Sequence, residues 1–210
     1  GVLYACASRN EDQAREFGIK HKASTHYNNY LSLAECKEVD VIYIATPHSL
    51  HHEHALLCLA NKKHVLCEKP MGLNEIQVLS MIAAATKNKV FLMEAVWTAF
   101  LPAIIQVKQM INVGKIGDIR HIKADFGFRT IFDAQSRLFN PNLAGGSLLD
   151  IGIYPLFISL ILSGYPSYVQ SIAHLAATGV DDECTILLQF SSGATASLYS
   201  TLTCDTDTIC

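Results

Sequence analysis

The chain has 210 residues, half of them hydrophobic, with 16 basic and 19 acidic residues and a formal net charge of −3. This length allows one large domain or two modest ones, and the absence of any lysine or arginine block argues against nucleic-acid binding. The longest apolar runs are shorter than the roughly 20 residues that cross a bilayer, so we expect no membrane partner.

The cysteines and the N-terminal sequence indicate a cytoplasmic location. Seven cysteines are scattered through the sequence, and most lie within apolar runs, as buried, reduced thiols do in cytosolic proteins. No basic stretch leads into an apolar one at the N-terminus, so no signal peptide is predicted. We therefore expect a cytoplasmic protein that acts on small molecules.

The first half of the sequence alternates short apolar runs with helical patterns, which is typical of βαβ units around a parallel sheet. Strands are predicted at residues 2–7, 41–45, 64–67 and 90–93. Helices are predicted between them, and Asn10 and Asn74 are placed to cap two of these helices. The run 41–45 is apolar throughout, as expected of a central strand that is covered on both faces.

The periodicity changes in the second half. After a helix that begins near residue 101, apolar and polar residues alternate at 122–128 and 194–199, the pattern of half-buried strands. An apolar helix is predicted between them at 148–162. The predicted fold class is α/β: an incomplete Rossmann-type parallel-sheet domain at 1–97, then an incomplete α/β substrate and dimerisation domain with a largely antiparallel open sheet at 98–210.

A dinucleotide-binding fold normally opens with a strand, a glycine-rich turn and a helix whose N-terminus holds the pyrophosphate. No such glycine pattern occurs, and residues 2–7 correspond to the second strand of that fold, so we expect the first strand and its turn to be missing. The strand is followed by Ser8 and Arg9. A hydroxyl and a guanidinium suit the 2′-phosphate of NADP, where NAD enzymes place an acidic residue. The alternative is a helix cap followed by an exposed arginine.

Four histidines lie after the 41–45 strand, at an end where open parallel sheets bind ligands. They follow Thr46 and Pro47 and are His48, His51, His52 and His54. Either His48 or His51 contacts the cofactor, or the histidines occupy ordinary positions on the surface or at a helix N-terminus. No metal site is predicted, because only Glu53 adds a further ligand type nearby.

Cys67-Glu68-Lys69-Pro70 ends the next predicted strand. A lysine at this place, beside a carboxylate, is able to orient a substrate hydroxyl and to favour ionisation of a neighbouring acid. The alternative for Lys69 is a surface ion pair before a turn.

The most specific polar pattern is Gly-Gly-Ser-Leu-Leu-Asp-Ile-Gly-Ile-Tyr-Pro at residues 145–155. Asp150 and Tyr154 are four residues apart, hence on one face of a helix that is otherwise apolar. Buried polar groups need partners or a pocket, so Tyr154 is a candidate to exchange the substrate proton, with Lys69 favouring its phenolate. The alternative is a core tyrosine and a structural aspartate, with Pro155 kinking the helix.

Two other groups have simpler interpretations. Glu94, Trp97 and Phe100 either line the same cleft or, for the aromatic residues, pack in the core. The acidic triplet at residues 181–183 follows a glycine and is predicted to be a solvated turn rather than a cation site.

Four segments together resemble the glucose-fructose oxidoreductase/inositol dehydrogenase (Gfo/Idh/MocA) family. In chain order they are Ala45-Thr46-Pro47-His48, Cys67-Glu68-Lys69-Pro70, Met93-Glu94-Ala95-Val96-Trp97-Thr98, and the run from Gly145 to Tyr154. The resemblance implies an NADP-dependent dehydrogenase that oxidises a trans-dihydrodiol or an aldose such as D-xylose, and that forms a homodimer when complete.

The resemblance also implies roles for individual residues. Lys69 and Tyr154 would be the catalytic pair, and Asp150 a substrate-binding or orienting residue. The residues near NADP would be Ser8, Arg9, Thr46, Pro47, His48, His51, Glu68, Lys69 and Trp97. Family members begin before Gly1 and continue beyond Cys210, and they often carry arginine where this chain has Ala99. These departures favour a rival hypothesis, a non-catalytic truncated isoform or paralogue that senses a cofactor or binds a partner.

Overall fold

The computed structural model describes residues 1–208 and divides the chain into two compact units, Gly1–Ala95 and Val96–Cys210. The sequence places the domain boundary two residues later, after residue 97. Each unit has a hydrophobic core of its own.

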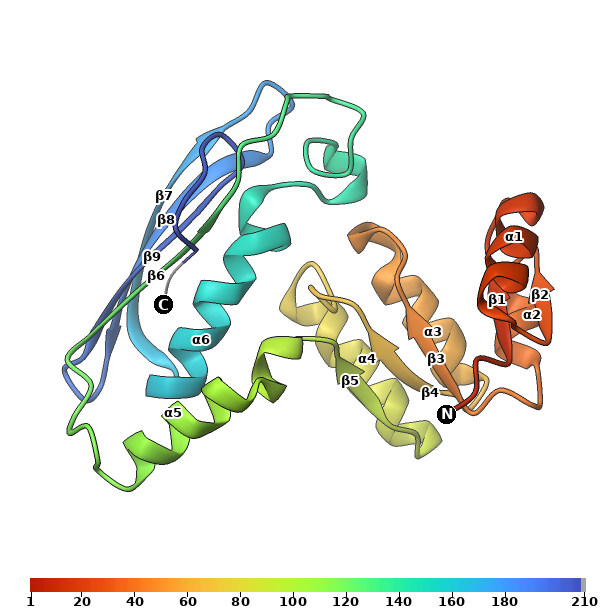
Figure 1. Ribbon diagram of the computed structural model, residues 1–210, viewed down its shortest axis with the longest axis horizontal. Helices are drawn as coiled ribbons and strands as arrows, with labels where there is room; N and C mark the ends of the chain where they lie inside the picture. Colours follow the sequence, from red (N-terminus) through yellow and green to blue (C-terminus); the bar gives the residue numbers. More distant parts are fainter. Residues whose placement is uncertain (209–210) are drawn as a thin grey trace. The chain divides into compact units, whose positions relative to one another are not determined.

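The first unit alternates strands and helices. In chain order they are β1 (Ala5–Ala7), α1 (Glu11–His21), β2 (Thr25–Tyr27), α2 (Tyr30–Glu35), β3 (Val41–Ile44), α3 (His51–Ala60), β4 (His64–Cys67), α4 (Glu75–Asn88) and β5 (Leu92–Glu94) (Figure 1). The strand pairs are parallel: β1 pairs with β2, and β3, β4 and β5 form a second sheet in that order. This arrangement confirms the predicted Rossmann-type parallel sheet.

Asparagine side chains cap the N-termini of three helices of this unit. Asn10 accepts a hydrogen bond from Gln13 N at 3.1 Å, and Asn74 accepts one from Gln77 N at 3.0 Å, as the sequence predicts. Asn29 caps the short helix α2 in the same way. Each cap satisfies an N–H group that helix geometry leaves without a partner.

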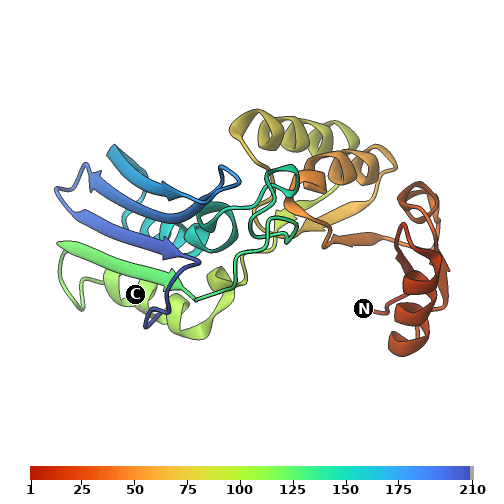
Figure 2. The ribbon, with the colours of Figure 1, turned by 90° about the horizontal axis from the view of Figure 1, so that it is seen from above.

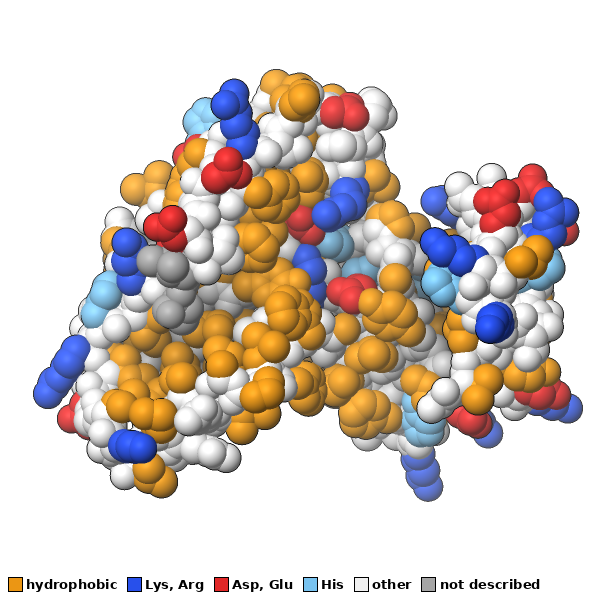
Figure 3. Space-filling view, in the orientation of Figure 1, with side chains coloured by type: hydrophobic (Ala, Val, Ile, Leu, Met, Phe, Trp, Pro, Cys, Tyr) orange, Lys and Arg blue, Asp and Glu red, His pale blue; other side chains and the backbone are white. Residues whose placement is uncertain are grey.

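Strand β3 differs from the prediction. It was expected to be central and covered on both faces, but among the described residues it is an edge strand, and Val41 and Tyr43 are each 56% exposed. The physical reason is a cavity of about 580 Å³ between β1 and β3, lined by apolar side chains of both strands. The hollow is visible in the space-filling view (Figure 3). In the doubly wound strand order 3-2-1-4-5-6, this cavity takes the place of the first strand.

The second unit is built on a mixed sheet of β6 (His121–Gly127), β9 (Thr195–Thr201), β8 (Asp181–Phe190) and β7 (Pro166–Leu175), in that spatial order (Figure 2). β6 and β9 are parallel, and the other pairs are antiparallel. Helix α5 (Pro102–Asn112) precedes the sheet, and α6 (Ile153–Ser163) packs on one face of it. The largely antiparallel open sheet is therefore confirmed.

The two faces of this sheet differ in polarity and cover. On the side of α6, alternate residues of β8, among them Ile186 and Leu188, are buried. The other face is left with exposed apolar side chains, namely Tyr168, Ile172 and Leu187. The alternation arises because successive side chains of a strand point to opposite faces.

The predicted helix at 148–162 is irregular at its start. Residues Leu148–Gly152 form a π-helical turn, and α6 follows directly. Pro155 lies in the first turn of α6 and has no N–H to donate to a preceding carbonyl, which favours the change from α to π geometry before it. The predicted disturbance at Pro155 thus takes the form of a π turn.

The segment Pro141–Ser163 is the one part of the described chain that is long and apolar enough, by length and composition alone, to cross a membrane. Its apolar window is 44% buried inside the protein, and α6 lies against β6 and β9. A single core helix of this kind is weak evidence for a membrane span.

The acidic triplet at residues 181–183 belongs to a strand. The prediction of a solvated turn at 181–183 is wrong, because these residues begin β8 and Asp182 is 8% exposed.

The described cysteines are free thiols. Burial raises the pKa of Cys58 to about 11 and that of Cys67 to about 12, so both remain protonated at neutral pH. Cys210 lies outside the described residues.

Candidate active site

The carboxyl ends of β3, β4 and β5 lie along one edge of their sheet, because the three strands are parallel neighbours. Thr46, Pro47 and His48 follow β3, and Glu68 and Lys69 follow β4. The structure therefore brings these five predicted residues to the edge where open parallel sheets bind ligands. Lys69 is half-buried there.

His51 joins the two loops at this edge. Its side chain has no exposed surface, its Nε2 lies 2.7 Å from the carbonyl oxygen of Thr46, and its Nδ1 lies 2.8 Å from that of Pro70. Carbonyl oxygens only accept hydrogen bonds, so a ring nitrogen of His51 that carries a proton donates to the carbonyl it faces. His51 thus lies between the loops of Thr46 and Lys69, and its contact with a cofactor stays a prediction.

Replacing His51 by leucine is expected to destabilise the protein by about 2 kcal/mol, because two buried carbonyl groups would lose their partners. Urea unfolding followed by circular dichroism measures the change. His21→Leu is the matched control, since His21 is exposed on α1 and its replacement should alter stability by less than about 0.5 kcal/mol. Equal stability of the two variants would mean that His51 does not hold the loops.

Two glutamates support the loop that carries Lys69. Glu68 contacts the hydroxyl of Tyr43 through a short hydrogen bond, and burial together with this bond raises the pKa of Tyr43 to about 12. Glu94, at the end of β5, accepts a hydrogen bond from Met71 N at 2.7 Å. The backbone on either side of Lys69 is therefore held by neighbouring strands.

Ser8 and Arg9 follow β1, across the cavity from β3. Ser8 and Thr46 both line this cavity, as does His54, whose Nδ1 lies 3.0 Å from Thr46 Oγ1. Burial lowers the pKa of His54, Glu53 opposes this effect, and the positive charge of Arg9 adds a smaller lowering. Ser8 after β1 and Thr46 after β3, both assigned to the cofactor by the sequence, thus border one cavity of the first unit.

Asp150 lies in the π turn of the second unit and has a partner that the sequence did not predict. Its side chain is 5% exposed, and its Oδ1 lies 2.7 Å from a guanidinium nitrogen of Arg137, whose side chain is 60% exposed. A carboxylate with so little exposure requires a compensating charge, and Arg137 supplies one while keeping contact with solvent. The pair therefore fixes Asp150 and leaves a cation near it.

Tyr154 follows one helical turn later and is bordered by aromatic side chains. The indole Nε1 of Trp97 donates to the hydroxyl of Tyr154 at 3.3 Å. The ring of Phe126 lies 5.5 Å from that of Tyr154 between centroids. Trp97, expected near the cofactor, is thus seen in contact with the candidate proton acceptor.

The site residues fall into two sets, one in each unit. Residues after β1, β3 and β4 gather in the first unit, and Asp150, Tyr154 and Trp97 gather in the second. Two residues of the site were not predicted: Arg137 lies in an irregular loop without any periodic pattern, and Asp181 was assigned to a solvated turn. Within the described residues no group of three metal-ligating side chains is found, and the four histidines after β3 form none.

Two family models match the chain. Residues 2–96 match the model described as an oxidoreductase family with an NAD-binding Rossmann fold, and residues 104–208 match the GFO/IDH/MocA C-terminal domain. Among known proteins, trans-1,2-dihydrobenzene-1,2-diol dehydrogenase of Sus scrofa is 41% identical over 203 residues, which cover 96% of this chain and 60% of that protein.

Solved structures also match most of the chain. Aldose-aldose oxidoreductase from Caulobacter crescentus, complexed with glycerol, superposes with a TM-score of 0.89 at 30% identity, covering 97% of this chain and 64% of that one. A 3-ketoreductase from Actinomadura kijaniata, in complex with TDP-benzene and NADP, gives a TM-score of 0.86 at 29% identity, covering 95% and 61%. The chain therefore spans about three fifths of the length of the proteins it matches.

Proposed function

The chain belongs to the GFO/IDH/MocA oxidoreductase family, and from that premise we propose that the protein at its full natural length is an NADP-dependent dehydrogenase of a trans-dihydrodiol or an aldose such as D-xylose. The observation that carries the proposal is Tyr154, a phenol that receives an indole N–H and is preceded by a buried, charge-paired aspartate. The dihydrodiol dehydrogenase name of the similar pig protein supports this substrate class.

In the proposed reaction, Tyr154 takes the proton of the substrate hydroxyl. The positive charge of Lys69 favours the phenolate form that accepts this proton. Asp150, held by Arg137, accepts a hydrogen bond from a second hydroxyl of the diol or sugar and orients it. NADP, when bound, supplies the acceptor for the hydride that leaves the substrate carbon whose hydroxyl is deprotonated by Tyr154. Each of the three predicted catalytic residues therefore has one task in the proposed reaction.

The first unit fits part of a nucleotide cofactor. The strand-end edge, with Thr46 and His48 after β3 and Lys69 after β4, is where a dinucleotide binds in this type of sheet. Ser8 offers a hydroxyl and Arg9 an exposed guanidinium after β1, a donor set that suits a phosphate on the ribose. We therefore assign the 2′-phosphate of NADP to Ser8 and Arg9.

Replacing Arg9 by glutamine is expected to weaken NADPH binding by about ten- to a hundredfold and to leave NADH binding unchanged, because a charge-assisted hydrogen bond contributes about 1.5–3 kcal/mol. Fluorescence titration of the full-length protein with each cofactor measures both constants. Arg15→Gln is the matched control, since Arg15 is an exposed residue of α1 paired with Asp12. Equal losses for both cofactors would contradict the phosphate assignment.

The rival function is a non-catalytic protein that binds a cofactor or a partner. Ala99, which stands where family members often carry arginine, favours it. NADPH titration of this chain beside the full-length protein separates the two functions. Binding by the longer protein with turnover of a dihydrodiol or D-xylose supports the enzyme, binding without turnover supports the cofactor-binding rival, and binding by neither supports the partner-binding rival.

Two further expectations remain predictions. A homodimer is predicted by the family resemblance, and the uncovered face of the second sheet offers exposed apolar side chains of the kind that interfaces use. The cytoplasmic location rests on the pattern of the cysteines.

A further inference from the structure

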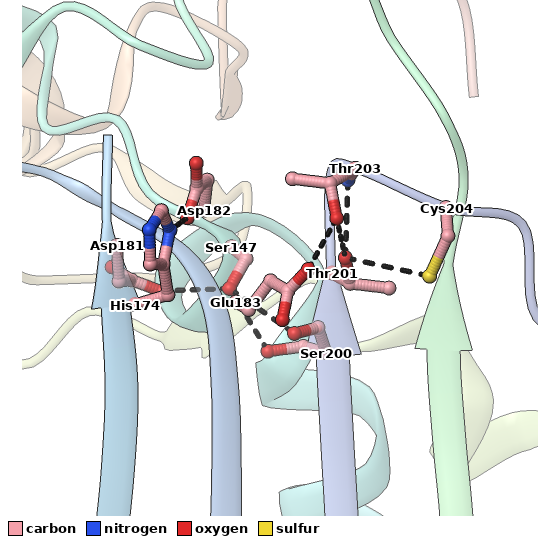
Figure 4. Close-up of polar contacts among 9 residues, drawn as sticks. All are labelled: Ser147, His174, Asp181, Asp182, Glu183, Ser200, Thr201, Thr203 and Cys204. Atoms are coloured by element: carbon pink, nitrogen blue, oxygen red, sulfur yellow. Dashed lines mark hydrogen bonds and ion pairs between the residues drawn. The ribbon is translucent and has the colours of Figure 1, made fainter. Parts of the chain in front are cut away.

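The helical segment that carries Asp150 and Tyr154 begins against a carboxylate of β8. Asp181 Oδ2 accepts a hydrogen bond from Ser147 Oγ at 2.7 Å and a second from Leu148 N at 2.7 Å. The close-up shows Asp181 beside Ser147, with Ser200 of β9 on the other side of that hydroxyl (Figure 4). Ser147 has no exposed surface. The start of the segment is therefore joined to two strands of the sheet.

Two glycines allow this close approach. Gly146 has a φ of +119°, and a Cβ on it would overlap Asp181 Oδ1. A Cβ on Gly152 would lie 2.9 Å from Ser200 Oγ. Side chains at either place would push the segment away from β8 or β9. The glycines of the 145–155 pattern thus permit docking of the π turn on the sheet.

The π turn itself needs outside support. The first N–H groups of a helical segment have no partner within it, and π geometry is rare and persists mostly as single turns at functional sites. Asp181 provides acceptors for the N–H of Leu148 and for the hydroxyl before it. A charged acceptor makes such bonds shorter and stronger than a neutral one.

We propose that Asp181 is a positioning residue, whose carboxylate sets the places of Asp150 and Tyr154 by holding the start of their helical segment on the sheet. Asp150 lies two residues after Leu148, and Tyr154 lies four residues further on, so a shift at the start displaces both. The catalytic consequence rests on the proposed function, because small misplacements of reacting groups reduce the rate strongly. The displacement of Asp150 and Tyr154 does not depend on the proposed function.

The test uses the single tryptophan of the chain. Trp97 donates its indole N–H to Tyr154, so ¹⁵N-tryptophan labelling of the 210-residue chain gives one indole NMR signal that reports where the tyrosine lies. Tyr154→Phe defines the shift produced by losing this hydrogen bond. We expect Asp181→Ala to move the signal in the same direction. Asp181→Asn, whose amide oxygen is able to accept both hydrogen bonds, is expected to restore most of the wild-type position.

Asp182→Asn is the matched control, because Asp182 is the adjacent buried acid but pairs with His174 at 2.6 Å instead. It should leave the indole signal in place. A folded Asp181→Ala chain with the wild-type signal would overturn the proposal. If Asp181→Ala does not fold, Ser147→Ala removes one of the two hydrogen bonds at little change in volume, and it must move the signal by a smaller step in the same direction; no movement overturns the proposal equally.

Steady-state kinetics of the full-length protein measure how loss of the Asp181 carboxylate affects catalysis. Asp181→Ala is expected to lower kcat about tenfold, with the KM for NADP unchanged, and Asp181→Asn to recover most of kcat. A shifted indole signal with unchanged kcat would uphold the positioning role and overturn the proposed role of Tyr154. An unshifted signal overturns the positioning role whatever the kinetics, so the two failures are distinguishable.

Discussion

Replacing Tyr154 by phenylalanine in the full-length protein is expected to lower kcat by about 10²- to 10⁴-fold, the range that a positioned general base contributes. Only the hydroxyl is lost, and it is the atom that the indole of Trp97 contacts. The KM for NADP should change little, because Tyr154 belongs to the second unit and the residues after β1 and β3 that we propose to bind the cofactor belong to the first. Steady-state rates with a trans-dihydrodiol and with D-xylose measure the effect.

Tyr165→Phe is the control for this substitution. Tyr165 lies two residues after the end of α6 and is 89% exposed, so loss of its hydroxyl should leave kcat unchanged. A Tyr154→Phe enzyme with near-normal turnover would remove the tyrosine from the mechanism and leave only the family resemblance for the reaction.

Replacing Lys69 by methionine is expected to lower kcat about 10²-fold or more, because methionine retains the unbranched chain and removes the positive charge that favours phenolate. Steady-state rates of the full-length protein with a trans-dihydrodiol and with D-xylose measure the loss.

Lys87→Met provides the comparison, because Lys87 is an exposed lysine in the last turn of α4. Its replacement should leave kcat unchanged. A Lys69→Met enzyme with near-normal kcat would remove Lys69 from the proposed proton transfer.

The regular elements of the fold were predictable where local signals were strong. Strand β4 has the predicted bounds, and α1 and α4 begin at the predicted asparagine caps. Strand β7 was not predicted, because nine of its ten residues are exposed and its sequence carries no alternation of polar and apolar residues. The edge position of β3 was also unpredictable, since an apolar run contains no information on which neighbour pairs with it.

The candidate site was predictable to the extent that it follows strand ends. Lys69 was found because it ends a recognisable strand, and Tyr154 because it is polar on an apolar segment. Arg137 and Asp181 were missed because each reaches its partner from a separate part of the chain, 13 and 33 residues away from Asp150 and Leu148 respectively. His51 was assigned to the cofactor because its type and position fit, whereas its burial is decided by packing.

A double-variant cycle on kcat tests most directly whether Lys69 and Tyr154 perform one chemical step. If the lysine acts only through ionisation of the tyrosine, Lys69→Met in a Tyr154→Phe background has almost no further effect, and the double variant is no slower than the slower single variant. Losses that multiply, so that the double variant falls by the product of the two single effects, would contradict a shared proton transfer.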